Sequence, residues 1–295
     1  VAARRLILQM MLASGNHNCA VRGSDGQDWT RFQMGVHRDD QSGELCPVWG
    51  DCRLQDLAYR YQVDGQVFPR NPSPYPMETV NPFIVRDFAR CIQCGRCVQA
   101  CNEIQVNNAI NFGYKGAFTK IVAAGDRPLR DSDCVFCGEC VQVCPVGALV
   151  EKDVRYRVRQ WETETVRTTC SYCGVGCQLN LHVKDNRVVK VSGVEGAAPN
   201  YGSLCVKGRF GYDFVNSPER LKTPLIKENG QGREASWDEA LDLVAARLGK
   251  IKTDHGPDSL GVLTSARVTN EENYLASKFT RAVLQTNNID HCARL

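Results

Sequence analysis

Apolar side chains recur at helical spacing toward the carboxyl end of the chain. In SWDEALDLVAARLGKIK they share one helical face, at Ala240, Leu241, Val244, Ala245 and Leu248. Ser236 and Glu239 have capping-box spacing at the start of this helix. SLGVLTS (259–265) predicts a buried strand, and a second helix, capped by Thr269, is expected to continue to Leu284. Helix, strand and helix in this order predict the start of an α/β layer.

The middle of the chain changes to a two-residue alternation. LNLHVKDNRVVKVSGV (179–194) alternates apolar and polar residues on both sides of Asp185 and Asn186, which predicts a β-hairpin. Two other stretches predict domain boundaries. One is 69–82, whose five prolines disfavour helix and central strand, and the other is the charged segment 155–165.

The amino-terminal segment RRLILQMMLASG begins at Arg4 and joins a basic pair to a short apolar run. This is the outline of an export signal, and an apolar-rich helix ending near Gly15 is the alternative. No apolar run reaches the roughly eighteen residues of a membrane span. A cytoplasmic protein is expected, because the cysteines farther along resemble metal ligands more than disulfide partners.

Composition is ordinary except for cysteine, which occurs 16 times in 295 residues. The 36 basic and 33 acidic residues leave a net charge of +3, which predicts neither a nucleic-acid-binding nor a membrane-binding surface. A chain of this length has room for two or three domains. The functional information therefore lies in the spacing of the cysteines.

Eight cysteines fall into two runs of the same spacing, CIQCGRCVQAC (91–101) and CVFCGECVQVCP (134–145). Both resemble the runs of bacterial two-cluster ferredoxins, in which three cysteines of a run bind one 4Fe–4S cluster and the fourth binds the other. Gly95 and Gly138 are expected to form the tight turns that aim three thiolates at one cluster. The resemblance assigns one cluster to Cys91, Cys94, Cys97 and Cys144. It assigns the second cluster to Cys134, Cys137, Cys140 and Cys101.

A zinc site and a disulfide framework are the alternatives for these two runs. Zinc sites use ligands in pairs, which two complete runs of four fit less well. Thiolate is the soft ligand that iron–sulfur clusters require. Asn102 stands where a proline usually follows the first such run. Because that proline shapes the turn and binds nothing, the site is expected to tolerate the change.

A third group, CSYCGVGC followed at a distance by Cys205, has a different spacing. The predicted hairpin lies between its parts and is expected to return the chain to the site. This group, with GSLCVKGRFGYDFVNSPERLKTPLIK, resembles the amino-terminal cluster domain of molybdenum or tungsten formate dehydrogenases. The resemblance implies a cluster on Cys170, Cys173, Cys177 and Cys205. It also implies that Lys207 lies between this cluster and the pterin as an electron relay, with a solvated surface lysine as the alternative.

A fourth site is suggested by HNC (17–19) and CPVWGDCRLQDLAYRYQV (46–63). These segments resemble the cluster site shared by complex I's large subunit, iron-only hydrogenases and NAD-linked formate dehydrogenases. The resemblance implies ligands at His17, Cys19, Cys46 and Cys52. The intervals from His17 to Cys19 and from Cys19 to Cys46 depart from the family pattern, so His37 is an alternative to His17. Buried thiols without a cluster are the other alternative.

The chain closes on TNNIDHCARL (286–295), which contains Cys292, the one cysteine outside the four groups. By resemblance, the metal-binding cysteine or selenocysteine is expected next, at position 296. A selenocysteine codon read as stop and a boundary chosen by an experimenter both remain open as explanations. The fragment is therefore expected to contain no catalytic residue and to be inactive toward formate alone. Cys292 is expected to be a structural neighbour of the active site.

These features predict an α+β protein made of small iron–sulfur domains followed by the start of an α/β pterin-binding domain. The expected boundaries are 1–75 for a His–Cys cluster domain and 76–155 for a two-cluster ferredoxin domain. A cluster domain of the molybdopterin oxidoreductase type is expected at 165–225, and the first part of the pterin-binding domain at 226–295.

The resemblance implies the electron-transfer portion of a formate dehydrogenase alpha subunit with four 4Fe–4S clusters. The full-length protein would carry molybdopterin guanine dinucleotide with molybdenum or tungsten, convert formate to carbon dioxide, and pass electrons to diaphorase-type or ferredoxin-linked subunits. One alternative is a non-catalytic iron–sulfur subunit like the complex I large subunit or a hydrogenase subunit. Another is a different pterin oxidoreductase, such as an assimilatory nitrate reductase. The stretch VKGRFGYDF after Cys205 favours formate dehydrogenase.

Overall fold

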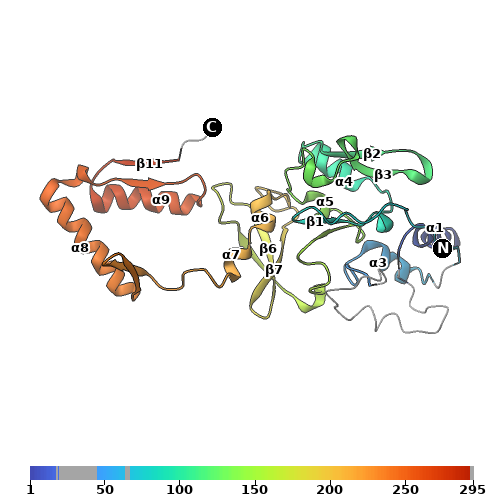
Figure 1. Ribbon diagram of the computed structural model, residues 1–295, viewed down its shortest axis with the longest axis horizontal. Helices are drawn as coiled ribbons and strands as arrows, with labels where there is room; N and C mark the ends of the chain where they lie inside the picture. The colour runs from blue at the N-terminus through green and yellow to red at the C-terminus, as the bar shows by residue number, and fades with distance from the viewer. Residues whose placement is uncertain (18, 20–44, 64–66, 293–295) are drawn as a thin grey trace.

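The structure is a computed structural model that describes residues 1–17, 19, 45–63 and 67–292. Its long axis runs from the amino-terminal helices, through a ferredoxin-like region and a hairpin-containing region, to a carboxyl-terminal lobe of residues 225–292 (Figure 1). Residues 217–224 form neither helix nor strand and lead into this lobe. The four regions therefore follow one another in space in the same order as in the sequence.

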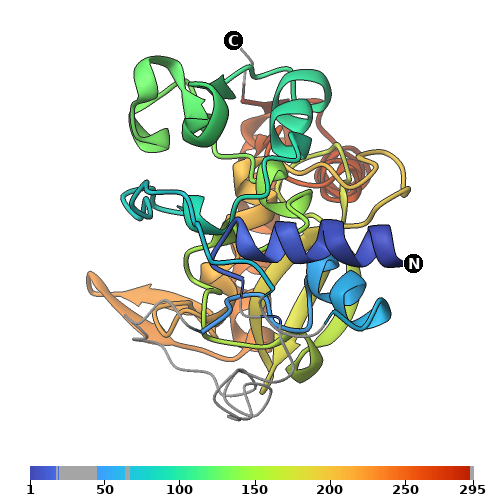
Figure 2. The same ribbon diagram turned by 90° about the vertical axis from the view of Figure 1, so that its right-hand side faces the viewer.

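The amino-terminal region contains the helices α1 (Ala2–Ala13) and α3 (Arg53–Arg60). The predicted apolar-rich helix is confirmed, because α1 ends just before Gly15 and buries Leu8 and Leu12. Figure 2 looks onto this end of the molecule, where α1 lies beside α3. Their shared core extends to Val146 and Ala148 of the ferredoxin-like region. Within the described residues, no helix has both the length and the apolar character needed to cross a bilayer.

The ferredoxin-like region is built from short elements. Its strands and α-helices are β1 (Ile84–Arg86), α4 (Arg96–Gln99), β2 (Ile110–Gly113), β3 (Lys120–Ala123), α5 (Glu139–Gln142) and β4 (Leu149–Glu151). Its 3₁₀ and π-helical turns are η1 (Phe88–Arg90), η2 (Ala100–Ile104), η3 (Gly116–Phe118), η4 (Ala124–Asp126), η5 (Leu129–Asp131) and η6 (Gln160–Glu162). β1 pairs antiparallel with β4, and β2 pairs antiparallel with β3.

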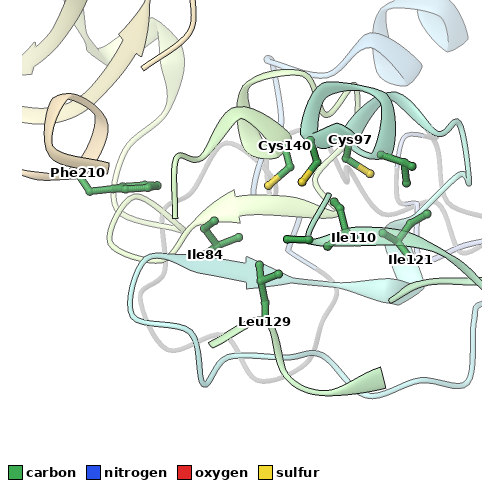
Figure 3. Packing of buried hydrophobic residues seen from close by; sticks show 10 residues of the cluster. Ile84, Cys97, Ile110, Ile121, Leu129, Cys140 and Phe210 are labelled. Atoms are coloured by element: carbon green, nitrogen blue, oxygen red, sulfur yellow. The ribbon is translucent and has the colours of Figure 1, made fainter. Parts of the chain in front are cut away.

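One hydrophobic cluster joins these elements, and three of its buried members, Cys97, Cys101 and Cys140, are predicted ligands of iron–sulfur clusters. Cys97 and Cys140 lie among Ile84, Ile110 and Leu129 in the interior (Figure 3). Phe210, from the next region along the chain, packs against the same cluster. The sulfur sites and the apolar core of this region are therefore parts of one interior.

The proline-rich segment 69–82 forms neither helix nor strand, as predicted. Glu78 forms an isolated antiparallel bridge with Arg86 and an ion pair to the same residue at 2.6 Å. Glu78 also accepts the backbone N–H of Leu129 at 3.0 Å. The hydroxyl of Tyr75 donates to the Phe118 carbonyl at 2.9 Å, and Lys152 donates to the Thr79 carbonyl at 2.9 Å, so several residues tie the segment to the ferredoxin-like region.

The hairpin-containing region comprises β5 (Glu164–Thr169), β6 (Gln178–Lys184), β7 (Arg187–Gly193), α6 (Val206–Phe210) and α7 (Asp213–Asn216). The predicted hairpin is confirmed, with β6 and β7 antiparallel. Asp185 and Asn186 between them have φ of 50° and 58°, the left-handed backbone that a two-residue hairpin turn requires. β5 adds a third strand beside β6, which the sequence alone did not predict.

The carboxyl-terminal lobe begins with a hairpin and continues as alternating helices and strands. Its elements are β8 (Leu225–Glu228), β9 (Gln231–Glu234), α8 (Trp237–His255), η7 (Pro257–Ser259), β10 (Val262–Thr264), α9 (Asn270–Phe279), η8 (Thr280–Leu284) and β11 (Ile289–His291). Ser236 caps α8, and Thr269 with Glu272 forms a full capping box on α9. β10 and β11 pair in parallel with α9 between them, which confirms the predicted start of an α/β layer.

The prediction that the strand at 259–265 is buried is wrong. Leu263 in β10 is 87% exposed, and the apolar face of α8 is open at Leu241 and Val244. The physical reason is that among the described residues β10 pairs with β11 alone and no second layer covers that face. The periodicity correctly predicted the elements, but burial depends on what packs against them.

Gly193, at the end of β7, provides a test of packing in the hairpin-containing region. A methyl group at this position would overlap the backbone of Gly202, whereas one at Gly249 in α8 would meet open space. We expect Gly193→Ala to lower the free energy of unfolding by about 2–3 kcal/mol or more, since overpacked backbone cannot move aside cheaply. Gly249→Ala is the matched control and should raise the free energy by about 0.5–1 kcal/mol. Urea unfolding followed by circular dichroism measures both, and equal stability of Gly193→Ala and the unsubstituted chain would contradict the packing described.

Candidate iron–sulfur sites

The two ferredoxin-type runs share one backbone conformation. Gln93 and Gly95 in the first run have φ of 53° and 75°, and Phe136 and Gly138 in the second have 53° and 72°. Positive φ is uncommon for residues other than glycine, so its repetition at Gln93 and Phe136 shows the same turn formed twice. In both runs the N–H of this residue donates to a cysteine sulfur at 3.4 Å, Cys91 in one and Cys134 in the other.

The first ferredoxin site consists of Cys91, Cys94, Cys97 and Cys144. Burial, and then the neighbouring sulfurs of Cys144, Cys91 and Cys94, raise the pKa of the Cys97 thiol to about 12. Cys91, Cys94, Cys97 and Cys144 line one small apolar pocket, so Cys144 of the second run lies beside three cysteines of the first. The structure thus brings together the four residues predicted from the resemblance, and cluster binding there remains a prediction.

The second ferredoxin site consists of Cys134, Cys137, Cys140 and Cys101. Burial first, and then the sulfurs of Cys137, Cys134, Cys97 and Cys101, raise the pKa of the Cys140 thiol well above its ordinary value. Cys101, at the end of the first run, therefore lies among three cysteines of the second. The influence of Cys97 on Cys140 places the two ferredoxin sites side by side.

The hairpin site consists of Cys170, Cys173, Cys177 and Cys205. β5 ends immediately before Cys170 and β6 begins immediately after Cys177, while Cys205 starts α6. The backbone N–H of Cys170 donates to the carbonyl of Cys177 at 2.8 Å, closing the loop between these strands. Burial, and then the sulfurs of Cys170, Cys173 and Cys205, raise the pKa of the Cys177 thiol. The hairpin thus returns Cys205 to the group, as expected.

The predicted relay residue, Lys207, lies in α6 with an exposed side chain. Its relay role stays a prediction. Two residues farther along the same helix, Arg209 is only 1% exposed. Sequence reasoning assigned Arg209 no role, because within the matched stretch it was one basic residue among several.

The His–Cys site consists of His17, Cys19, Cys46 and Cys52, and His37 lies outside the described residues. Burial first, and then the sulfurs of Cys46 and Cys52, raise the pKa of the Cys19 thiol. The three thiols therefore converge although a long insert separates Cys19 from Cys46. Burial, and then the charges of Arg90 and Arg70, lower the pKa of His17 to about 4.

The imidazole ring of His17 has the properties expected of an iron ligand. Its Nε2 atom is buried and has no hydrogen-bond partner, and its low pKa leaves the imidazole neutral, which is the form that binds metals. A buried ring nitrogen without a partner is costly, and an iron atom would supply one. His17 and Cys19 also face the same two guanidinium groups, those of Arg90 and Arg70.

Buried arginines hold the backbone around the His–Cys site. Arg90, 2% exposed, donates to the carbonyls of Asn16 at 2.7 Å and Leu45 at 3.2 Å. Arg159 donates to the carbonyl of Cys46 at 2.6 Å. Both arginines belong to the segment that also carries the ferredoxin runs, so they fix this site against the ferredoxin-like region. Neither arginine could be identified from the sequence, because the carbonyls that they bind are far away along the chain.

The four sites follow one another along the molecule. The sulfur of Cys144 contributes to the raised pKa of Cys52, and the N–H of Arg53 donates to the carbonyl of Pro145 at 2.9 Å, so the His–Cys site adjoins the first ferredoxin site. The second ferredoxin site follows, and α6 with the hairpin site lies beyond it, toward the carboxyl-terminal lobe (Figure 1). The four sites therefore follow one another in a series, in which most cysteines are buried or half-buried and Cys94 and Cys205 are exposed.

The donor set fits iron–sulfur clusters chemically. All sixteen cysteines are free thiols, which excludes the disulfide alternative in this structure. Among the residues that the structure describes, no group of three or more histidine, cysteine or acidic side chains is arranged to hold a single metal ion. A 4Fe–4S cluster instead gives each of four thiolates its own iron. Burial raises the pKa of thiols such as Cys19, Cys52 and Cys97, so binding iron at these positions must release protons.

Cys292 lies apart from the four groups, just after β11, and is exposed. Its sulfur accepts the backbone N–H of Ala266 at 3.3 Å and lies 3.5 Å from the hydroxyl oxygen of Ser265. These hydrogen bonds, that of Ser265 first, lower the pKa of the Cys292 thiol. The contacts connect β11 to the end of β10, in keeping with the structural role expected for this cysteine.

Cys144→Ala tests whether the second run supplies a ligand to the first ferredoxin site. We expect the variant, reconstituted anaerobically, to lose about four iron atoms per chain, because a 4Fe–4S cluster is held by four thiolates. Cys292→Ala is the matched control and should keep the full iron content. Iron and sulfide analysis together with electron paramagnetic resonance (EPR) spectroscopy measures the loss. Full iron content in Cys144→Ala would refute the crossed arrangement.

A cavity of about 440 Å³ lies where three regions meet. Its walls include Trp49, Cys144 and Glu151, together with His182 and Lys190 of the three-stranded sheet. Burial raises the pKa of the Glu151 carboxyl to about 7, against the opposing charges of Lys190 and Arg209. His182 lies between the hydroxyls of Thr165 and Ser192, and burial lowers its pKa to about 4. The cavity therefore holds a neutral imidazole and a carboxyl that is about half protonated at neutral pH.

Glu151 predicts a pH-dependent stability. Between its unfolded pKa of about 4.5 and its folded pKa of about 7, the native state binds a proton that the unfolded state does not. The free energy of unfolding therefore falls as pH rises through this window, by an amount on the order of 3 kcal/mol. Glu151→Gln should remove this dependence and be more stable than the unsubstituted chain at about pH 8. Urea unfolding at about pH 5 and pH 8 measures the effect.

The exposed Glu164→Gln in β5 is the control for this measurement and should leave the pH dependence unchanged. An equal pH dependence in Glu151→Gln and the unsubstituted chain would show that Glu151 is not the group responsible.

Comparison with known proteins agrees with the cysteine groups. Residues 90–148 match the model of a 4Fe-4S dicluster domain. Residues 163–217 match the molybdopterin oxidoreductase Fe4S4 domain, and residues 220–295 match the molybdopterin oxidoreductase model. These matches confirm the α+β class, with iron–sulfur domains followed by the beginning of a molybdopterin domain.

Two relatives come from Bacillus subtilis (strain 168). The "Putative formate dehydrogenase YrhE" is 37% identical and the "Probable oxidoreductase YjgC" is 36% identical, each over 83% of this chain. The chain spans 29% of the length of both relatives. Among solved structures, an NAD⁺-reducing NiFe-hydrogenase in the H₂-reduced state is 28% identical, with a TM-score of 0.41 over 53% of this chain and 57% of that one.

Proposed function

We propose that this chain, which carries the Fe4S4 domain and the beginning of the molybdopterin domain of the molybdopterin oxidoreductases, is the electron-transfer portion of a formate dehydrogenase catalytic subunit. The observation that carries the proposal is the unbroken series of four sulfur sites, whose last member adjoins the segment that matches the molybdopterin model. The names of relatives such as "Putative formate dehydrogenase YrhE" support formate as the substrate.

Oxidation of formate to carbon dioxide releases two electrons and one proton. A molybdenum or tungsten ion on molybdopterin guanine dinucleotide supplies the two-electron chemistry, and 4Fe–4S clusters carry electrons singly. The twelve cysteines of the hairpin and two ferredoxin sites, with the His–Cys residues, would hold four clusters. Burial of the thiols and the N–H donors at Gln93 and Phe136 are the means by which the chain adjusts their potentials.

We also propose the route that electrons take through these sites. Lys207, exposed on α6 beside the hairpin site, relays electrons from the pterin. Electrons then pass through the second and first ferredoxin sites to the His–Cys site. A diaphorase-type or ferredoxin-linked subunit accepts them near α1 and α3.

A non-catalytic electron-transfer subunit is the second candidate function. The convergence of Cys19, Cys46 and Cys52 with a partnerless His17 is compatible with it, because the resembling site occurs in complex I's large subunit and iron-only hydrogenases as well as in NAD-linked formate dehydrogenases. The match of residues 220–295 to the molybdopterin oxidoreductase model favours the catalytic assignment instead.

The proposed function is tested with a protein of the relatives' length that contains this sequence. We expect anaerobic formate to reduce its clusters within one turnover, as seen by EPR. Cys177→Ala should abolish reduction of the ferredoxin-type clusters by formate, while dithionite still reduces them, because the hairpin site is their proposed entry point. This 295-residue chain alone should show no formate-dependent reduction.

Dithionite provides the control, since it reduces clusters without the pterin. If dithionite reduces the clusters of the longer protein and formate reduces none, formate dehydrogenase activity is excluded and the second candidate function stands.

A further inference from the structure

Arg209 is a buried cation at the junction between the hairpin site and the second ferredoxin site. It lies one helical turn after Cys205, and its N–H donates to the Cys205 carbonyl at 3.1 Å. Its side chain is 1% exposed, yet it points out of its own region and into the ferredoxin-like region. Burying a guanidinium is costly unless it is paired and fully hydrogen-bonded. The partners of Arg209 therefore show what stabilises it in the interior.

The guanidinium of Arg209 makes three contacts with the second ferredoxin-type run. Nε donates to the carbonyl of Cys137 at 2.8 Å, and Nη1 donates to the side-chain oxygen of Gln142 at 2.8 Å. Nη2 lies 3.2 Å from a carboxylate oxygen of Glu139. A single side chain from the hairpin region therefore contacts the backbone of a predicted cluster ligand and the side chains at both ends of α5.

The second run is shaped to receive this side chain. A Cβ atom at Gly138 would overlap the stem of Arg209, so glycine is needed there for space as well as for its φ of 72°. The equivalent Gly95 of the first run meets only the ring of Phe112, at 3.3 Å. The two runs share a backbone, and only the second accommodates an arginine against it.

Gln142 carries the connection back to the hairpin region. Its side-chain oxygen accepts the N–H of Gly193 at 2.9 Å, and its nitrogen donates to the carbonyl of Gly202 at 3.0 Å. Beside this network, the rings of Phe210 and Phe83 stack with centroids 4.8 Å apart. The two regions are therefore held by a closed set of polar contacts with an aromatic pair alongside.

The charge of Arg209 acts on the sulfur beside it. The Nε atom of Arg209 lies 2.8 Å from the backbone oxygen of Cys137, so the positive charge stands beside this predicted ligand. A buried cation in that position stabilises the added negative charge of a reduced cluster bound there. Glu139, 4% exposed, pairs with Arg209 and reduces this effect without removing the hydrogen bond to Cys137.

We propose that Arg209 is a positioning residue for electron transfer, which holds the hairpin site against the second ferredoxin site and raises the reduction potential of the cluster bound there. In the step it favours, one electron leaves the hairpin site and one enters the second ferredoxin site, with no proton or atom transferred. The proposal rests on the cluster binding in the proposed function and is independent of formate as substrate.

The test compares Arg209→Met, which removes the charge and keeps the apolar stem, with Arg209→Lys, which keeps the charge. The 295-residue chain is reconstituted anaerobically with iron and sulfide and titrated with redox mediators under EPR. In Arg209→Met the ratio of reduced to oxidised cluster at fixed potential should fall about tenfold for one cluster, which is about 59 mV for one electron. Arg209→Lys should stay within about twofold of the unsubstituted chain.

Arg220→Met, at an exposed arginine of the same region, is the matched control and should leave every potential unchanged. Hydrogen–deuterium exchange of the peptide containing Gly193 gives a second readout and should speed up in Arg209→Met but not in Arg220→Met. Should Arg209→Met fail to assemble its clusters, Arg209→Gln takes its place with the same expected shift.

Two results would overturn the proposal. One is an unchanged potential in Arg209→Met with full iron content, and the other is an equal shift in Arg209→Met and Arg209→Lys, which would make the effect one of packing. Because the mediators set the potential, failure of formate to reduce the longer protein would count against the proposed function alone.

Discussion

The burial of closely grouped thiols is the constraint on which the rest of this structure depends. In each site, burial first and neighbouring sulfurs second raise the pKa of at least one thiol, as at Cys97, Cys140, Cys19 and Cys177. Several of these cysteines are also core residues, as Cys97 and Cys140 are in the ferredoxin-like region. Small regions with short strands have little apolar surface to bury, so iron would stabilise both the charge and the fold at once.

Buried arginines place positive charge beside the cysteine groups at the edges of the ferredoxin-like region. Arg159 donates to the carbonyl of Cys46, and Arg209 donates to the carbonyl of Cys137. In both cases a guanidinium from one region binds the backbone at a cysteine of another. A cation placed there offsets negative charge and holds the backbone of one region against the next.

Local chemistry in the sequence predicted the longer helices and the β6–β7 hairpin, and it grouped the cysteines that the structure brings together, but it did not predict most of the short strands. The hairpin at Asp185 and Asn186, the cap of α9 at Thr269 and the crossing of Cys144 to the first run all follow from short-range spacing or from a motif. The burial of Leu263 was predicted wrongly, because exposure depends on a layer that periodicity cannot supply. Arg209 was missed because its partners lie about seventy positions earlier in the sequence.

The repeated turn of the two ferredoxin-type runs limits where the two sites can differ. Backbone φ values and N–H donors to sulfur are matched between the runs, so these features cannot make the two sites differ. The residue after the glycine differs in charge and setting, since it is an exposed Arg96 in one run and a buried Glu139 in the other. A duplicated backbone thus supplies two equivalent sites, and this one side-chain position, with Arg209 paired to Glu139, makes them electrostatically different.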